Sequence, residues 1–192
     1  MNAIVVRGVL VGALAGLLFG FDTAVISGVT ADLRAVYQLS AGGLGITVSS
    51  ALWGTLAGAL LAGPPGDRFG ARQCLKVIAL FYLASSLGCA WAWDWPSLLF
   101  FRVMAGLAIG ASTVLAPVYV TEIAPPAWRG AMVGMFQFNI VLGILIAYLS
   151  NYLIGTMMLG AEEWRWKFGV AAMPGLVLFA LLFTIPQSPR WL

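Results

Sequence analysis

Residues 9–29 spell VLVGALAGLLFGFDTAVISGV, an apolar run in which Asp22 is the only charged residue. A run of this length predicts a membrane-spanning helix, since about 20 apolar residues cross the hydrocarbon core. A secretory signal peptide is the alternative, but its apolar region is shorter and has no place for an aspartate. We therefore interpret the run as a retained span. Because an ionised carboxylate costs about 3 kcal/mol or more at such a depth, Asp22 is expected to be functional, as an ion or proton relay or as a substrate contact.

The composition of the whole chain agrees with a membrane protein. Of its 192 residues, 61% are hydrophobic and 9% are charged, and the mean hydropathy is +0.97. A soluble domain carries about 25% charged residues, so this chain could not cover a water-facing surface. The net charge of +3 is too small and too dispersed to indicate nucleic acid. With no histidine, two scattered cysteines and no phosphate loop, the sequence predicts no metal site, no cofactor and no enzyme activity.

Windows of about 20 apolar residues predict an all-α membrane fold, with one six-helix bundle over residues 1–192. The expected spans are about 7–29, 43–64, 74–93, 97–120, 130–154 and 168–186. The cations gather on one side of these spans: Arg7, Arg68, Arg72, Lys76, Arg129 and Arg190. The other side holds Arg34, Arg165 and Lys167. By the positive-inside rule the first group is cytoplasmic, which predicts that both termini are cytoplasmic.

An internal repeat relates the first and fourth spans. A shift of 90 residues pairs Gly20 with Gly110 and Asp32 with Glu122, among other matches. Because the two spans run in opposite directions, the repeat predicts two three-helix units of inverted topology, as in several secondary transporter folds. Glycines also recur every four residues in spans 1, 2 and 4. This spacing predicts close helix packing, with a dimerisation face as the alternative.

Arg102 is a second charge within a predicted span. It lies about five residues into the fourth span, and Asp22 lies about seven residues below the outer end of the first, so both are about 8–10 Å below that surface. Opposite charges at one depth, on helices that the repeat makes equivalent, predict an ion pair. A change in their separation would couple protonation of Asp22 to helix movement. The alternatives are a static salt bridge, or an Arg102 that snorkels to the interface without touching Asp22.

Several motifs, in register along the whole chain, resemble the sugar porters of the major facilitator superfamily. Within them, the chain is most similar to the N-terminal half of a bacterial proton-coupled sugar symporter of the xylose type. The segment FGFDTAVISG (19–28) resembles the first-span signature, and GPPGDRFGAR (63–72) resembles the loop 2–3 motif. Residues 117–130 are similar to the signature that follows span 4. Further matches to span patterns are Arg102 with Gly106 and Gly110, Gln137 and Gly143, 164–165, and 186–192.

The resemblance implies roles for particular residues. Asp22 is expected to be the proton-coupling carboxylate and Arg102 its partner. Facilitative relatives tend to have asparagine at the Asp22 position, so the aspartate favours symport. Gln137 is expected to bind sugar hydroxyls and Phe19 to contact the sugar ring. We expect a cytoplasmic gate network formed by Gly63, Asp67, Arg68, Gly70, Arg72, Glu122, Arg129 and Arg190. The alternative is that these charges only follow the positive-inside rule.

Three positions depart from the family pattern. Ala71 replaces a basic residue of the loop 2–3 motif, and Gln187 replaces the usual glutamate after span 6. Both changes predict a weaker inward gate. Ile144 occupies a place where some symporters of this type carry a second sugar-binding glutamine, which leaves the identity of the sugar open.

Length is a further departure, because the family has twelve spans and this sequence matches the first six. A lone bundle would expose Asp22 and Gln137 to lipid, so we expect a fragment that pairs with a missing C-terminal half, or a bundle that pairs with a second copy. The expected partners are a pentose or hexose, a proton and membrane lipids, in a bacterial plasma (inner) membrane. The expected function is proton-coupled monosaccharide symport by alternating access. The alternatives are a facilitative uniporter, and a non-transporting sugar sensor or inert fragment.

Overall fold

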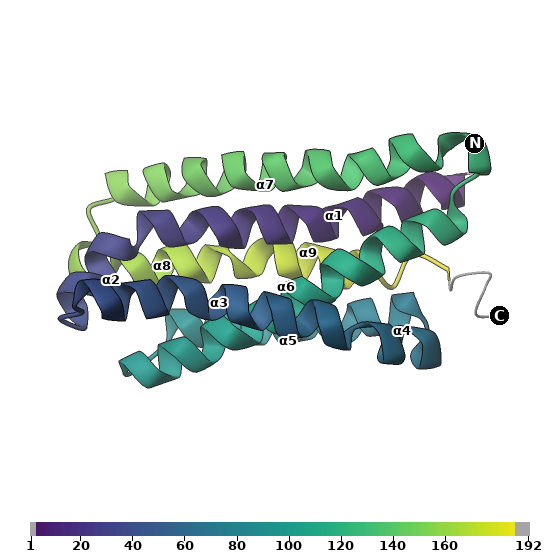
Figure 1. The fold of residues 1–192 in the computed structure, drawn as a ribbon. Helices are drawn as coiled ribbons and strands as arrows, with labels where there is room; N and C mark the ends of the chain where they lie inside the picture. Colours follow the sequence, from purple (N-terminus) through teal and green to yellow (C-terminus); the bar gives the residue numbers. More distant parts are fainter. Residues whose placement is uncertain (1–2, 187–192) are drawn as a thin grey trace.

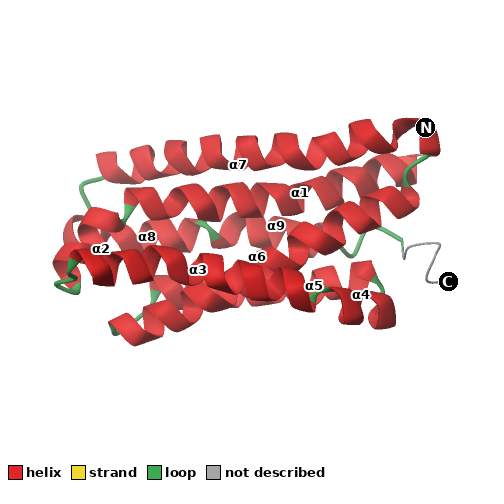
Figure 2. Cartoon of the chain, in the orientation of Figure 1, coloured by secondary structure: helices red, strands yellow, loops and turns green. Residues whose placement is uncertain are grey.

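In a computed structural model, which describes residues 3–186, the first apolar run forms α1 (Ala3–Val25) and a short 3-10 helix, η1 (Ile26–Gly28). The other helices that are long and apolar enough to span a membrane are α3 (Ala41–Leu61), α5 (Ala71–Ala90), α6 (Trp95–Ile123) and α7 (Arg129–Thr156). They lie on the predicted spans 2 to 5. Residues 3–186 contain no strand, and the predicted all-α class is confirmed (Figure 2).

The segment predicted as a sixth span differs from the prediction, because it forms two short helices. These are α8 (Glu163–Val170) and α9 (Ala172–Leu181), which meet at Ala171. Pro174 is the third residue of α9, and proline has no N–H to donate to the carbonyl four residues earlier, that of Val170. A single helix expected over 168–186 is therefore interrupted near its start.

Four connections between the spans contain short helices that were expected to be loops. They are α2 (Thr30–Val36), α4 (Gly63–Phe69), η2 (Pro126–Trp128) and η3 (Gly160–Glu162). Pro64 and Pro65 fit into α4 because they lie in its first turn, where backbone N–H groups have no helical partner. We call the two ends of the bundle the α2 end and the α4 end (Figure 1). Helix α1 begins at the α4 end and carries Asp22 toward the α2 end.

Two helix pairs, α1 with α7 and α3 with α6, pack backbone against backbone. Gly20 of α1 lies against the backbone of Ile140 on α7, and Gly110 of α6 lies against the backbone of Thr55 on α3. A Cβ atom at either glycine would collide with a carbonyl group. The 90-residue repeat aligns Gly20 with Gly110, so the two halves use equivalent glycines for equivalent contacts. These glycines therefore serve packing within the bundle and do not form a dimerisation face.

Burial differs strongly among the spans. The most apolar window of α1 is 78% buried, whereas the windows of α3 and of the segment containing α7 are 28% buried. Exposed apolar side chains on these two outer helices include Leu56, Leu60, Phe138, Leu149 and Tyr152. Lipid tails tolerate such faces and water does not, so this chain is an integral membrane protein.

Candidate functional site

Asp22 of α1 and Arg102 of α6 meet in the interior of the bundle. Arg102 Nη1 lies 3.4 Å from Asp22 Oδ2 and 3.5 Å from Oδ1. The two residues are 6% and 2% exposed, respectively. Arg102 therefore does not snorkel to the interface, and the two charges expected at one depth lie in contact.

The surroundings of Arg102 satisfy only part of its hydrogen-bonding capacity. Nη1 donates to both carboxylate oxygens of Asp22 at long distances. Nε has no hydrogen-bond partner in the described part of the chain. The guanidinium Cζ lies 5.8 Å from the ring centroid of Phe168 on α8. A buried donor without a partner costs about 1–3 kcal/mol. The pair thus joins a buried carboxylate to a cation that is only loosely bound to it.

A small cavity adjoins the pair between α1, α3 and α6. Its volume is about 110 Å³, and its lining includes Asp22, Arg102 and the predicted sugar-contact residue Phe19. Thr23 and Thr55 also line it, but their hydroxyls donate to carbonyls of their own helices, Phe19 O and Ala51 O. Ligand pockets usually have volumes of about 300–1,000 Å³, so this cavity has room for water and not for a whole sugar.

Gln137, the other predicted sugar ligand, lies elsewhere. It is exposed on α7 and does not line the cavity beside Asp22. Ile144, at the position where some symporters carry a second glutamine, is half-buried against the core at the α2 end. The structure therefore does not gather Phe19 and Gln137 around one closed pocket.

The predicted gate residues divide into two groups at the α4 end. Gly63, Asp67, Gly70 and Glu122 line one pocket of about 340 Å³, which also includes Ala71. Two carboxylates from α4 and α6 therefore face a common space. Gly70 has a φ of 81°, a conformation that glycine adopts readily, and it joins α4 to α5.

The cations of the predicted network bind other groups. Arg72 donates from Nε to Leu182 O at 3.2 Å and from Nη2 to Phe183 O at 3.5 Å. Arg129 Nε donates to Ala124 O at 3.2 Å, and the Arg68 guanidinium lies 5.7 Å from the Phe69 ring centroid. The ion pairs found in residues 3–186 join no two members of the set Asp67, Arg68, Arg72 and Arg129. Arg190 and Gln187 lie outside the described residues.

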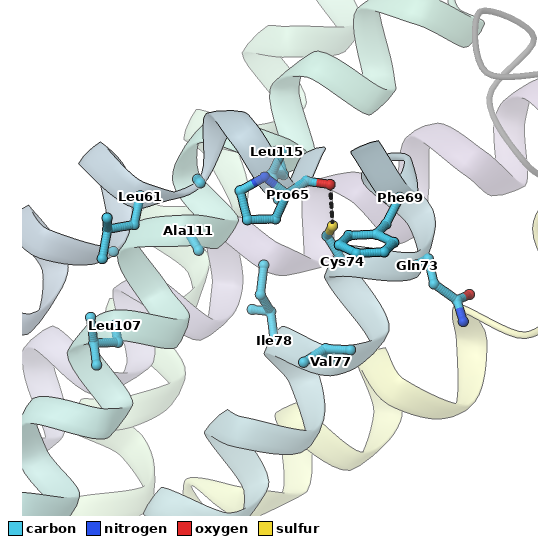
Figure 3. Close-up of a pocket in the computed structure, with 12 residues that line it drawn as sticks. Leu61, Pro65, Phe69, Gln73, Cys74, Val77, Ile78, Leu107, Ala111 and Leu115 are labelled. Atoms are coloured by element: carbon cyan, nitrogen blue, oxygen red, sulfur yellow. Dashed lines mark hydrogen bonds between the residues drawn. The ribbon is translucent and has the colours of Figure 1, made fainter. Parts of the chain in front are cut away.

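A larger groove between α3, α4, α5 and α6 has a different character (Figure 3). It has a volume of about 480 Å³, and none of its lining residues is charged. Cys74 Sγ, one of its few polar atoms, donates to Pro65 O at 3.2 Å. Sugar sites need several convergent polar groups, so we do not assign sugar binding to this groove.

Sequence reasoning missed a buried charge cluster at the α2 end. Lys167 of α8 is 5% exposed, and its ammonium group contacts Glu163 of the same helix and Asp32 of α2. Burial raises the pKa of the Asp32 carboxyl, against the attraction of Lys167, and nearby Glu163 raises it further. The four-residue spacing of Glu163 and Lys167 was a visible signal of a helical ion pair. The contact with Asp32 depends on the tertiary fold.

Comparison with known proteins agrees with this architecture. The profile of the sugar (and other) transporter family matches residues 8–192. A D-xylose transporter from Levilactobacillus brevis is 40% identical over 181 residues, which cover 94% of this chain and 39% of that protein. A D-xylose-proton symporter from Escherichia coli K12 is 37% identical over 213 aligned positions, covering 95% of this chain and 43% of the relative.

A solved structure shows the same fold. The xylose transporter XylE from E. coli, in a partially occluded inward-open conformation, superposes with a TM-score of 0.93 at 34% identity. The match covers 98% of this chain and 51% of that one. The chain thus spans about two fifths to one half of the relatives that it matches, and these relatives are transporters, not enzymes. On this evidence the chain belongs to the sugar (and other) transporter family, the sugar porters of the major facilitator superfamily.

Proposed function

We propose that this chain is the N-terminal half of a monosaccharide transporter that uses a proton gradient and works by alternating access. The observation that carries the proposal is the buried, loosely bound Asp22–Arg102 pair beside a water-sized cavity. A D-xylose-proton symporter among the relatives supports a pentose or a hexose as the sugar and a proton as the coupled ion.

Proton uptake at Asp22 is the proposed coupling step. A proton that reaches the carboxylate through the cavity removes the charge that attracts Arg102. The guanidinium, whose Nε has no hydrogen-bond partner within residues 3–186, then needs other acceptors. A bundle conformation that supplies those acceptors becomes favoured, so protonation shifts the equilibrium between access states.

The sugar is proposed to bind between this bundle and a second one. The cavity beside Asp22 is too small for a monosaccharide, and Gln137 is exposed on α7. An exposed amide suits a ligand held between two bundles, with Phe19 at the near edge of the site. The second bundle is the missing C-terminal half or, less simply, another copy of this chain.

The α4 end is proposed to face the cytoplasm of a bacterium, with both termini inside the plasma membrane. The excess of Lys and Arg in the connections at this end supports that orientation. Asp67 and Glu122, which line one pocket there, would contribute to a gate that closes in the outward-facing state. Lipids of the surrounding membrane would cover the remaining apolar faces.

The decisive experiment substitutes Asp22→Asn in the complete transporter, reconstituted in liposomes. Sugar accumulation driven by an inward proton gradient should fall at least about tenfold, whereas gradient-independent exchange of labelled sugar should persist. Glu162→Gln is the matched control, because it removes an exposed carboxylate at the α2 end. Accumulation that survives Asp22→Asn would overturn the coupling role. The chain reconstituted alone should show no flux; flux from it would indicate that two copies pair.

A further inference from the structure

The helix that carries Asp22 changes its geometry three residues beyond that carboxylate. Helix α1 ends at Val25, and η1 (Ile26–Gly28) follows before α2 begins at Thr30. Carbonyl groups at such a change lack regular helical partners. Two side chains from distant elements bind them. Asn151 of α7 donates Nδ2 to Val25 O at 3.4 Å, and Lys167 of α8 donates Nζ to Gly28 O at 2.7 Å.

Lys167 has an unusual environment for a lysine. Lysine is almost never fully buried unless it is paired, and this one is 5% exposed. Besides Gly28 O, its ammonium faces Glu163 Oε1 and, at 3.9 Å, Asp32 Oδ2. An ammonium group has three N–H donors, and three oxygens surround it here. Lys167 thus ties α8 to both η1 and α2.

The same helix also supports Arg102. Phe168, the residue after Lys167, places its ring 5.8 Å from the Arg102 guanidinium carbon. Trp164 is fully buried. Its ring centroid lies 5.9 Å from that of Tyr37 and 6.4 Å from that of Phe168, so α8 is packed against its neighbours by aromatic contacts. One short helix therefore contacts the segment that follows Asp22 and the cation that pairs with Asp22.

We propose that Lys167 is a positioning residue for the proton site. By holding Gly28 it fixes the end of α1, and this keeps Asp22 within reach of Arg102. Without Lys167 the end of α1 can move, the pair lengthens, and the Asp22 carboxyl holds its proton to a higher pH. The significance for transport rests on the proposed function, but the geometry can be tested without any transport.

Arg165 provides a matched control on the same helix. It forms an ion pair with Glu162 at 2.7 Å and donates Nη1 to Ala90 O at 2.9 Å. These contacts are of the same kinds as those of Lys167, but they lead to the end of α5 and not to α1. Loss of Arg165 should therefore destabilise the α2 end without moving Asp22.

The experiment measures protonation of Asp22 in the purified 192-residue chain, in detergent or nanodiscs. Dicyclohexylcarbodiimide adds to a protonated carboxyl: the acid proton goes to a carbodiimide nitrogen and the oxygen to its central carbon, and an acyl shift gives a stable N-acylurea. Peptide mass spectrometry then reports labelling at Asp22 across a pH series. Lys167→Met should move the labelling midpoint upward by about 1 pH unit. Lys167→Arg should restore the original midpoint, and Arg165→Gln should leave it unchanged.

An unchanged midpoint in Lys167→Met, or an equal shift in Arg165→Gln, would overturn the proposal. Lys167→Met leaves Asp32 and Glu163 without their cation, and this could prevent folding. In that case the double variant Lys167→Met with Glu163→Gln replaces the single variant in the experiment. It removes one acid with the lysine, and the same upward shift is expected; an unchanged midpoint there also counts against a positioning role. If the midpoint shifts while Asp22→Asn leaves accumulation intact, the positioning role stands and the proposed coupling function fails.

Discussion

At the α2 end of the bundle Lys167 and Arg165 bind carboxylates as well as carbonyl groups, whereas the contacts found at the α4 end within residues 3–186 join the cations to carbonyl groups and aromatic rings. Lys167 and Arg165 form ion pairs with Asp32, Glu163 and Glu162 at the α2 end. At the α4 end, Arg72 and Arg129 donate to carbonyls. Lys76 Nζ lies 4.2 Å from the ring centroid of Phe183, and Arg68 lies over Phe69.

The difference is that, within residues 3–186, an ion pair joins two elements at the α2 end, whereas hydrogen bonds to carbonyl groups join elements at the α4 end. Opposite charges at the α2 end neutralise each other inside one bundle. At the α4 end Arg72 of α5 binds carbonyls at the end of α9, and Arg129 of α7 binds the carbonyl at the end of α6. Asp67 and Glu122 line a shared pocket there.

The largest effect is expected for Arg102→Ala, in the half of the bundle toward the α2 end. This change leaves Asp22 buried without its cation, and the free energy of unfolding should fall by about 3–5 kcal/mol. Reversible unfolding of the purified chain in mixed micelles measures it. Adding Asp22→Asn to the same variant should recover most of the loss. An Arg102→Ala chain as stable as the original would show that the pair contributes nothing to folding.

A smaller effect is expected for Arg72→Gln at the α4 end. The variant loses the donors to Leu182 O and Phe183 O. Because these two contacts are partly exposed, the free energy of unfolding should fall by only about 1 kcal/mol. Amide hydrogen exchange near the end of α9 should also become faster. Arg68→Gln is the control, because an exposed cation over a ring contributes little. Equal losses in both variants would argue against specific binding of the α9 carbonyls.

The smallest effect is expected for Asp32→Asn, and its sign depends on pH. Burial raises the pKa of Asp32 above its ordinary value of 3.8, despite the attraction of Lys167. The folded state therefore binds this proton more tightly than the unfolded state, and stability falls as pH rises from 3.8 through the raised folded pKa. Asparagine lacks this penalty. Asp32→Asn should raise the melting temperature slightly at neutral pH, and the gain should vanish in acid; a loss at neutral pH would contradict it.

Features that depend on local composition could be predicted from the sequence, and contacts with backbone groups could not. The apolar windows located five spanning helices, and the repeat placed Asp22 and Arg102 at one depth. The interruption near Ala171 was missed because a hydropathy window does not register that Pro174 lacks an N–H. Likewise, Arg72 was assigned to a network of charges because sequence patterns show charged partners but not free carbonyls at a helix end.

The burial of Lys167 could not be predicted for a related reason. Its position between two predicted spans placed it at the membrane surface, where lysines are usually hydrated. Its actual partner, Gly28 O, is available only because α1 changes to a 3-10 helix at that point. That change is stabilised by Asn151, which lies more than a hundred residues away in sequence. Such a site requires three elements to be assembled first.

The separation of 80 residues between Asp22 and Arg102 also bears on how the protein is made. Ribosomes add about 5–20 residues per second, so the first helix waits about 4–16 s before its arginine has been synthesised. During that interval Arg102, which pairs with Asp22 in the folded bundle, is absent. An uncharged carboxyl is cheaper to insert into a bilayer than an ionised one, so the late synthesis of Arg102 places the highest cost of Asp22 at the insertion of its helix.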